Sequence, residues 1–179
     1  ALQDGYQLYT HNFMLTDDGK WAVIQQGMNV KDKTARRYHW HSENLKSFVD
    51  EPHTGICGKN QGIILDLTAK SAEENRNGIL EISHKAPEKI MKEVSLILPS
   101  HHDVQASDVN LKRLGAMLAM TREMQPANFE DLLMLKGVGP RTMQSLALVS
   151  EVIHGAPSRF QDPARFSFAH GGKDGHPFP

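Results

Sequence analysis

Residues 129–149 read FEDLLMLKGVGPRTMQSLALV, and this stretch decides the C-terminal half of the fold. It predicts a short apolar helix over 128–135, a Gly-Val-Gly turn, and a longer helix over 140–154 with Pro140 in its first turn. Two glycines this close permit a tight turn and leave no side chain between the backbone and a ligand. The stretch therefore predicts a helical hairpin whose turn a ligand can approach closely.

This hairpin resembles the helix-hairpin-helix motif of DNA-repair and DNA-processing proteins. Val138 is expected to anchor the turn between the helices, and the amides that follow it lie at a helix N-terminus, which attracts anions. Lys136 and Arg141 flank the turn with positive charge. The predicted nucleic-acid-binding residues are Lys136, Gly137, Val138, Gly139, Arg141 and Thr142. Such contacts hold phosphates without reading bases, so the expected partner is DNA of any sequence, in a DNA-processing or repair context. A structural hairpin, or one that docks another protein, is the alternative.

Asp162 is the candidate catalytic residue. Helix-hairpin-helix DNA glycosylases carry an essential Asp after the second helix and a glycine-containing turn, and here Asp162 follows Gly155 at a similar distance. The resemblance implies a carboxylate that stabilises a cationic sugar or activates a nucleophile. Arg141 stands where bifunctional members keep a lysine, so a Schiff-base lyase is not expected. If the protein is an enzyme, we expect a DNA hydrolase, glycosylase-like or nuclease-like, that uses Asp162 or a histidine and carboxylate cluster. A turn or capping role before Pro163 is the alternative.

Composition limits the classes of protein that fit. The chain has 179 residues with 20 Lys or Arg against 21 Asp or Glu, so any nucleic-acid contact must come from a local patch. No apolar run approaches the roughly 18 residues that a membrane span needs. The single cysteine excludes an internal disulfide framework and a multi-cysteine zinc site, and it favours a cytoplasmic location.

The N-terminal third is predicted to form strands. Runs 6–15 and 21–26 flank Asp17-Asp18-Gly19, which indicates a β-hairpin. Further strands are predicted over 36–41 and 62–67, with a loop over 50–58 between them. Arg36 and Arg37, with Tyr38 and Trp40, could present cations and stacking rings to nucleic acid; alternatively, the aromatic residues pack inward on a half-buried sheet.

Helical patterns replace the strands after Thr68. A capping box formed by Ser71 and Glu74 predicts a helix to about Lys85, weakened by Gly78, and Pro87 begins the next helix. The clearest helix is predicted over 108–124. Strands followed by helices predict an α+β fold, in which an antiparallel sheet segment precedes a helical bundle. The expected divisions are a β-rich segment over 1–68, a helical domain over 69–157 with the hairpin at 128–154, and an irregular tail over 158–179. Both ends read as the interior of a longer protein.

Ten histidines raise the question of a divalent metal. His39 and His41 lie two residues apart on a predicted strand and share a face, with Glu43 close by and His53 in the following loop. The candidate metal ligands are therefore His39, Glu43 and His53, and His101, His102 and Asp103 form a second polar cluster. The alternative is that each is a surface or hydrogen-bonded residue.

Several runs mix polar, aromatic and glycine residues more densely than core packing requires. They are 3–9, 25–29, 35–40, 51–55 and 168–175. Together they resemble an uncharacterised bacterial and archaeal family known as domain of unknown function 763, over nearly the whole chain. Members of that family are longer than this chain, and they usually have an apolar residue at the position of His41, which weakens the His39–His41 pair. The resemblance implies no established activity.

Overall fold

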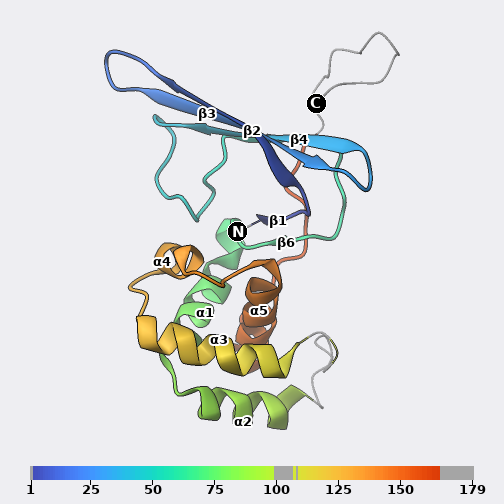
Figure 1. The fold of residues 1–179 in the computed structure, drawn as a ribbon, viewed down its shortest axis with the longest axis vertical. Coiled ribbons are helices and arrows are strands. Elements are labelled where there is room, and N and C mark those ends of the chain that lie inside the picture. Colours follow the sequence, from blue (N-terminus) through green and yellow to red (C-terminus); the bar gives the residue numbers. More distant parts are fainter. Residues whose placement is uncertain (1, 99–106, 108, 166–179) are drawn as a thin grey trace. The chain divides into compact units, whose positions relative to one another are not determined.

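The computed structural model describes residues 2–98, 107 and 109–165, which form two compact units (Figure 1). The sheet unit contains Leu2–Asp66 and the described residues from Phe160 to Arg165. The helical unit contains Leu67–Arg159. An antiparallel sheet region followed by helices confirms the predicted α+β class.

A four-stranded antiparallel sheet makes up most of the sheet unit. Its strands, in spatial order, are β2 (Gln7–Leu15), β3 (Trp21–Asn29), β4 (Thr34–His41) and β5 (Gly55–Cys57). A separate two-stranded ladder pairs β1 (Leu2–Gln3) with β6 (Leu65–Asp66). The β2–β3 hairpin turns through Gly19, whose φ of 83° favours glycine, so the hairpin prediction is confirmed.

The strands after β4 differ from their predictions. Strand β5 lies inside the predicted loop, and β6 covers only two residues of the predicted run 62–67. Three residues are too few to show a two-residue alternation, and β5 forms because Ile56 is buried opposite Tyr38. The chain also returns to this unit after the helices, where Phe160 bridges Leu65 and Arg165 bridges Cys57.

Five α-helices and one 3-10 turn make up the described helical unit. They are η1 (Lys70–Ala72), α1 (Glu73–His84), α2 (Pro87–Ile97), α3 (Leu111–Met124), α4 (Phe129–Met134) and α5 (Pro140–His154). Apolar residues at helical spacing, such as Ile79 and Ile82 on α1 and Leu146 and Val149 on α5, are fully buried. Burying each of them stabilises the unit by roughly 1.5–3 kcal/mol before entropy is counted.

The capping box predicted at Ser71 is wrong. Ser71 lies within η1, Ala72 is the N-cap of α1 with no side-chain cap bond, and the Ser71 hydroxyl lies 3.1 Å from Nη1 of Arg159. Side-chain caps occur instead at Asn110 and Asn128, which accept amide bonds at the starts of α3 and α4. Helix α3 begins at Leu111, and the earlier start predicted at residue 108 lies outside the described residues.

In the described ranges, no helix combines the length and hydropathy needed to cross a bilayer. The His101, His102 and Asp103 cluster, and the predicted tail beyond residue 165, lie outside the described residues.

Gly78 lies where α1 and α5 approach closely. A Cβ at this position would overlap the hydroxyl oxygen of Ser150, which is itself held by a 3.2 Å bond to the carbonyl of Asn75. At Gly115 on α3, by contrast, the nearest atom would be Met91 Sδ at 3.8 Å, an ordinary contact.

We therefore predict that two glycine-to-alanine substitutions change the free energy of unfolding in opposite directions. Gly115→Ala should raise the free energy of unfolding by about 0.5–1 kcal/mol, because alanine favours a helix. Gly78→Ala should lower it by about 1–3 kcal/mol, because the packed neighbours must move. Chemical denaturation of both variants measures the two values. Stabilisation by Gly78→Ala would contradict the close approach of the two helices.

Candidate functional site

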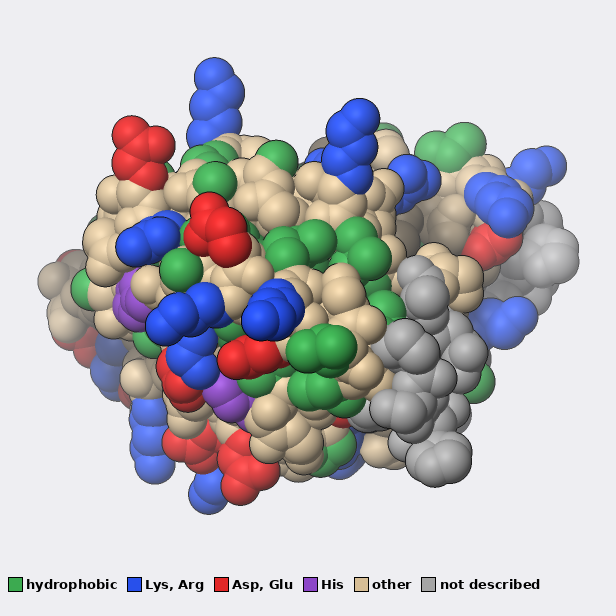
Figure 2. Space-filling model, turned by 90° about the horizontal axis from the view of Figure 1, so that it is seen from below, with side chains coloured by type: hydrophobic (Ala, Val, Ile, Leu, Met, Phe, Trp, Pro, Cys, Tyr) green, Lys and Arg blue, Asp and Glu red, His purple; other side chains and the backbone are tan. Residues whose placement is uncertain are grey.

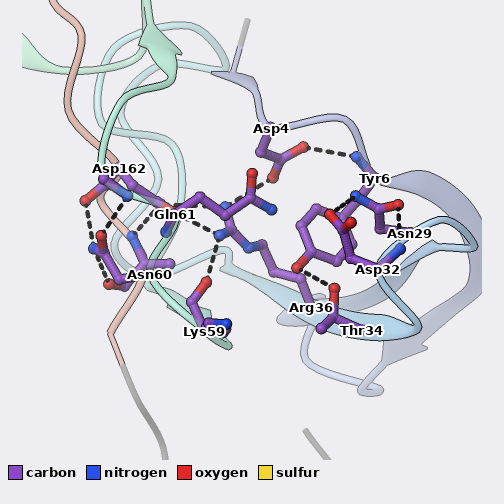
Figure 3. Close-up of polar contacts among 12 residues, drawn as sticks. Asp4, Tyr6, Asn29, Asp32, Thr34, Arg36, Lys59, Asn60, Gln61 and Asp162 are labelled. Atoms are coloured by element: carbon purple, nitrogen blue, oxygen red, sulfur yellow. Dashed lines mark hydrogen bonds and ion pairs between the residues drawn. The ribbon is translucent and has the colours of Figure 1, made fainter.

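Arg36 is the centre of a buried polar cluster in the sheet unit (Figure 3). Its side chain is 0 % exposed, and Nη1 lies 3.1 Å from Oδ2 of Asp4 and 3.2 Å from Oδ1 of Asp162. Nη2 donates to Oδ2 of Asp162 at 2.6 Å and to the carbonyl of Lys59 at 2.8 Å. The guanidinium thus binds Asp162 through two nitrogens, the strongest geometry for such a pair.

Two tyrosines complete the surroundings of Arg36. The Tyr38 hydroxyl donates to Oδ2 of Asp4, and the Tyr6 ring lies under the guanidinium, 4.8 Å from Cζ to the ring centroid. Burial, and then the bond to Asp4, raise the pKa of Tyr38, so its hydroxyl stays protonated and remains a donor. Burial alone would lower the pKa of Arg36, but Asp162 and Asp4 outweigh burial and raise it. Arg36 is therefore always charged.

The structure gives Asp162 a full set of hydrogen-bond donors. Besides Arg36, the amides of Gln61 and Ala164 donate to its carboxylate at 2.7 and 2.8 Å, and its side chain is 0 % exposed. Burial alone would raise the pKa of Asp162, but the bonds from Arg36 and the two amides outweigh it and lower the pKa. The catalytic role predicted for Asp162 would require the carboxylate to leave this cluster.

The cluster joins segments that are far apart in the sequence. Asp4 follows β1, Arg36 lies on β4, and Asp162 follows the helical unit. Asn60 also links two of these segments, since its Nδ2 donates to the carbonyls of Asp162 and Ala164, both at 3.0 Å. Arg36 was predicted as a cation that could be presented to nucleic acid, but its side chain is buried, and Asp4 was not predicted as its partner. The available signal was the alternation of β4, which puts Arg36 on the same face as Tyr38 and Trp40.

The three candidate metal ligands lie apart. His39 lies on the opposite face of β4 from Trp40, whereas the His53 ring packs on Trp40 with 4.8 Å between ring centroids. Glu43 forms an ion pair with Lys20 at 3.0 Å. No group of three or more His, Cys, Asp or Glu within the described ranges could hold a metal ion. Burial lowers the pKa of His53 to about 4, so that ring is neutral at pH 7.

The turn between α4 and α5 has the backbone that the Gly-Val-Gly stretch predicts. Gly137 has a φ of 96°, a conformation that favours glycine, and the amide of Val138 donates to the carbonyl of Leu135 at 3.1 Å. Gly139 is the N-cap of α5, and no side chain caps this helix. The Met143 amide donates to the carbonyl of Gly139, so the amides of Arg141 and Thr142 lie before the first intrahelical bond.

The positive charge at this turn comes from the two residues that flank it. Lys136 and Arg141 are exposed on either side of the glycines, while Thr142 is buried. Figure 2 shows the molecule from the α2 side, where Lys and Arg side chains alternate with Asp and Glu. On α2, for example, Lys89 and Lys92 lie beside Glu88 and Glu93, all exposed. The α2 face therefore mixes both signs of charge, whereas the two residues that flank the glycines of the turn are both cations.

We predict that Asp162→Asn lowers the free energy of unfolding of this chain by about 3–5 kcal/mol. The substitution leaves the buried charge of Arg36 without its principal partner. The exposed Asp17→Asn, on the hairpin turn, serves as the matched control and should change stability by less than about 0.5 kcal/mol.

The pH dependence follows from the lowered pKa of Asp162. Its contribution is present above the unfolded pKa of about 4 and is lost as the pH falls through the lower folded value. Urea titrations between pH 3 and pH 7 should show this loss in the parent chain and a smaller one in Asp162→Asn. Equal acid sensitivity of the two proteins would contradict the assigned ion pair.

Comparison with known proteins identifies a family but no individual relative. The model of the family described as "Protein of unknown function (DUF763)" matches residues 1–179. No curated protein and no solved structure matches the chain. Because the match extends over the entire sequence, through both the Arg36 cluster and the α4–α5 turn, the chain belongs to the DUF763 family.

Proposed function

We propose that the turn between α4 and α5 binds the phosphate backbone of DNA. The hairpin resembles the helix-hairpin-helix motif, in which glycines and a helix N-terminus receive a phosphate between two helices. The observation that carries the proposal is the uncapped start of α5. Helices α3 and α4 have asparagine caps, and α1 and α2 begin at alanines without a side-chain cap. What distinguishes α5 is that its N-cap is a glycine, so that no Cβ lies beside its first amides.

The backbone around the turn supports the access that a phosphate needs. A Cβ at Gly139 would meet nothing within 4 Å, so the space beside this residue is open. The amides of Arg141 and Thr142, together with the positive end of the helix dipole, favour an anion there. Gly137 has a different role, because it adopts the positive φ that the turn requires.

The two exposed cations determine what kind of recognition is expected. Lys136 and Arg141 provide charge, and neither has a resolved ion-pair partner in the described residues. Contacts to phosphates position a protein on DNA without reading its sequence. Since the chain as a whole is nearly neutral, binding should be weak, and it should weaken further as the salt concentration rises.

The first test removes the cations. Lys136→Ala with Arg141→Ala should weaken binding to duplexes of unrelated sequence about equally, and lower the salt slope by roughly one or two phosphate contacts. Fluorescence anisotropy at several salt concentrations measures both quantities. Circular dichroism and the melting temperature should hardly change, because exposed cations contribute little to folding.

Lys112→Ala with Arg113→Ala is the matched control. It removes one lysine and one arginine, both exposed, from the first turn of α3, whose amides are capped by Asn110. The control should keep the parent affinity and salt slope. Absence of DNA binding by the parent chain at low salt, or equal weakening by both double variants, would remove the nucleic-acid function from this turn. Salt-insensitive binding of a protein would favour the docking alternative.

The second test uses the missing cap directly. Gly139→Asp should raise the melting temperature, because aspartate is a good N-cap and its charge suits the start of a helix. The same carboxylate would take the amides that the phosphate needs and repel it, so DNA affinity should fall at least tenfold. Thermal unfolding and anisotropy on one sample give the two results. A stabilised variant with unchanged DNA affinity would show that no phosphate binds at α5.

A further inference from the structure

Strand β2 is a long edge strand that is exposed along almost its whole length. It ends the sheet order, so β3 is its only neighbour among the described strands. Its nine residues span about 30 Å, longer than most strands. All of them except Thr10 are exposed, and Leu8, Tyr9, Phe13, Met14 and Leu15 leave 47–66 % of their surface open.

The outer edge of β2 offers unpaired backbone groups. Alternate N–H and C=O groups of an edge strand point away from its neighbour. In the part of the chain that the structure describes, no hydrogen bond joins this edge to another segment. Only an extended chain can satisfy such a row of donors and acceptors, so the occupant of this edge is a β-strand.

Edge strands are normally protected against pairing by charges, prolines or bulges. Residues 7–15 include no charged residue and no proline. A bulge between Leu8 and Thr10 disturbs only the first part of the strand, so Thr10 to Leu15 stay regular.

We propose that β2 pairs with β2 of a second copy of this chain, antiparallel, about a two-fold axis normal to the sheet. Each copy would supply the unprotected edge that the other needs, and the pairing closes after two chains. The net charge of -1 gives the two copies little reason to repel each other. This inference is independent of DNA binding.

The alternation of β2 limits the register. Facing residues of an antiparallel pair lie on the same face of the sheet, so their numbers must differ by an even amount. An axis at Asn12 puts Asn12 opposite its own copy, Thr10 opposite Met14 and His11 opposite Phe13. Side chains that β2 exposes would then pack beside those of the other copy on each face of the joined sheet.

Paired charge variants test this arrangement. By light scattering, the parent chain should show twice the 20.0 kDa monomer mass. Asn12→Lys and Asn12→Asp should each show the monomer mass, because like charges then meet across the axis. An equimolar mixture of the two variants should regain the doubled mass, because opposite charges meet. Circular dichroism verifies that each variant is folded.

Asn44→Lys and Asn44→Asp are the matched controls. Asn44 is exposed in the same unit but lies outside the strands, so these variants should keep the mass of the parent chain. A parent chain that stays monomeric over the whole soluble concentration range overturns the proposal. So does an Asn12→Lys protein that keeps the doubled mass, or a mixture that stays monomeric.

Discussion

The ion pair between Arg36 and Asp162 is the constraint on which the sheet unit depends. A fully buried guanidinium is costly unless neighbouring groups offset its positive charge. Here two carboxylates, a carbonyl and an aromatic ring surround it. The pair also fixes backbone. Because Asp162 accepts the amides of Gln61 and Ala164 as well, the position of one side chain determines the course of two loops.

The same constraint separates structure from function in this chain. The cluster occupies the charged groups that looked most suitable for chemistry, namely Arg36 and Asp162. The features that a ligand or partner can reach are parts of the backbone: a helix that begins on a glycine, and a strand with an uncovered edge. Both present backbone groups, which bind phosphates or strands by general chemistry.

Local patterns in the sequence predicted the local structure well. The Asp-Gly turn gave the β2–β3 hairpin, and Pro87 and Pro140 marked the starts of α2 and α5. The capping box predicted at Ser71 was wrong, because the same residues form a 3-10 turn in which the Ser71 hydroxyl bonds to Arg159. The Arg36 cluster was beyond prediction since it joins residues 126 positions apart, and no local period records such a contact. The separation of His39 from His53 likewise depends on which side of the sheet a loop crosses.

The helical unit is inserted into the sequence of the sheet unit, and this has a consequence for synthesis. The insertion begins after Asp66 and ends before Phe160, whose neighbour in space is Leu65. When the ribosome has made β1 to β6, the partner of Arg36 is still about a hundred codons away. At the usual rate of translation, that is a delay of roughly 5–20 s. During this interval Arg36 has Asp4 as its carboxylate partner, and the second carboxylate of the cluster is missing. The sheet unit can therefore complete its buried cluster only after Asp162 has been made, at the end of the described chain.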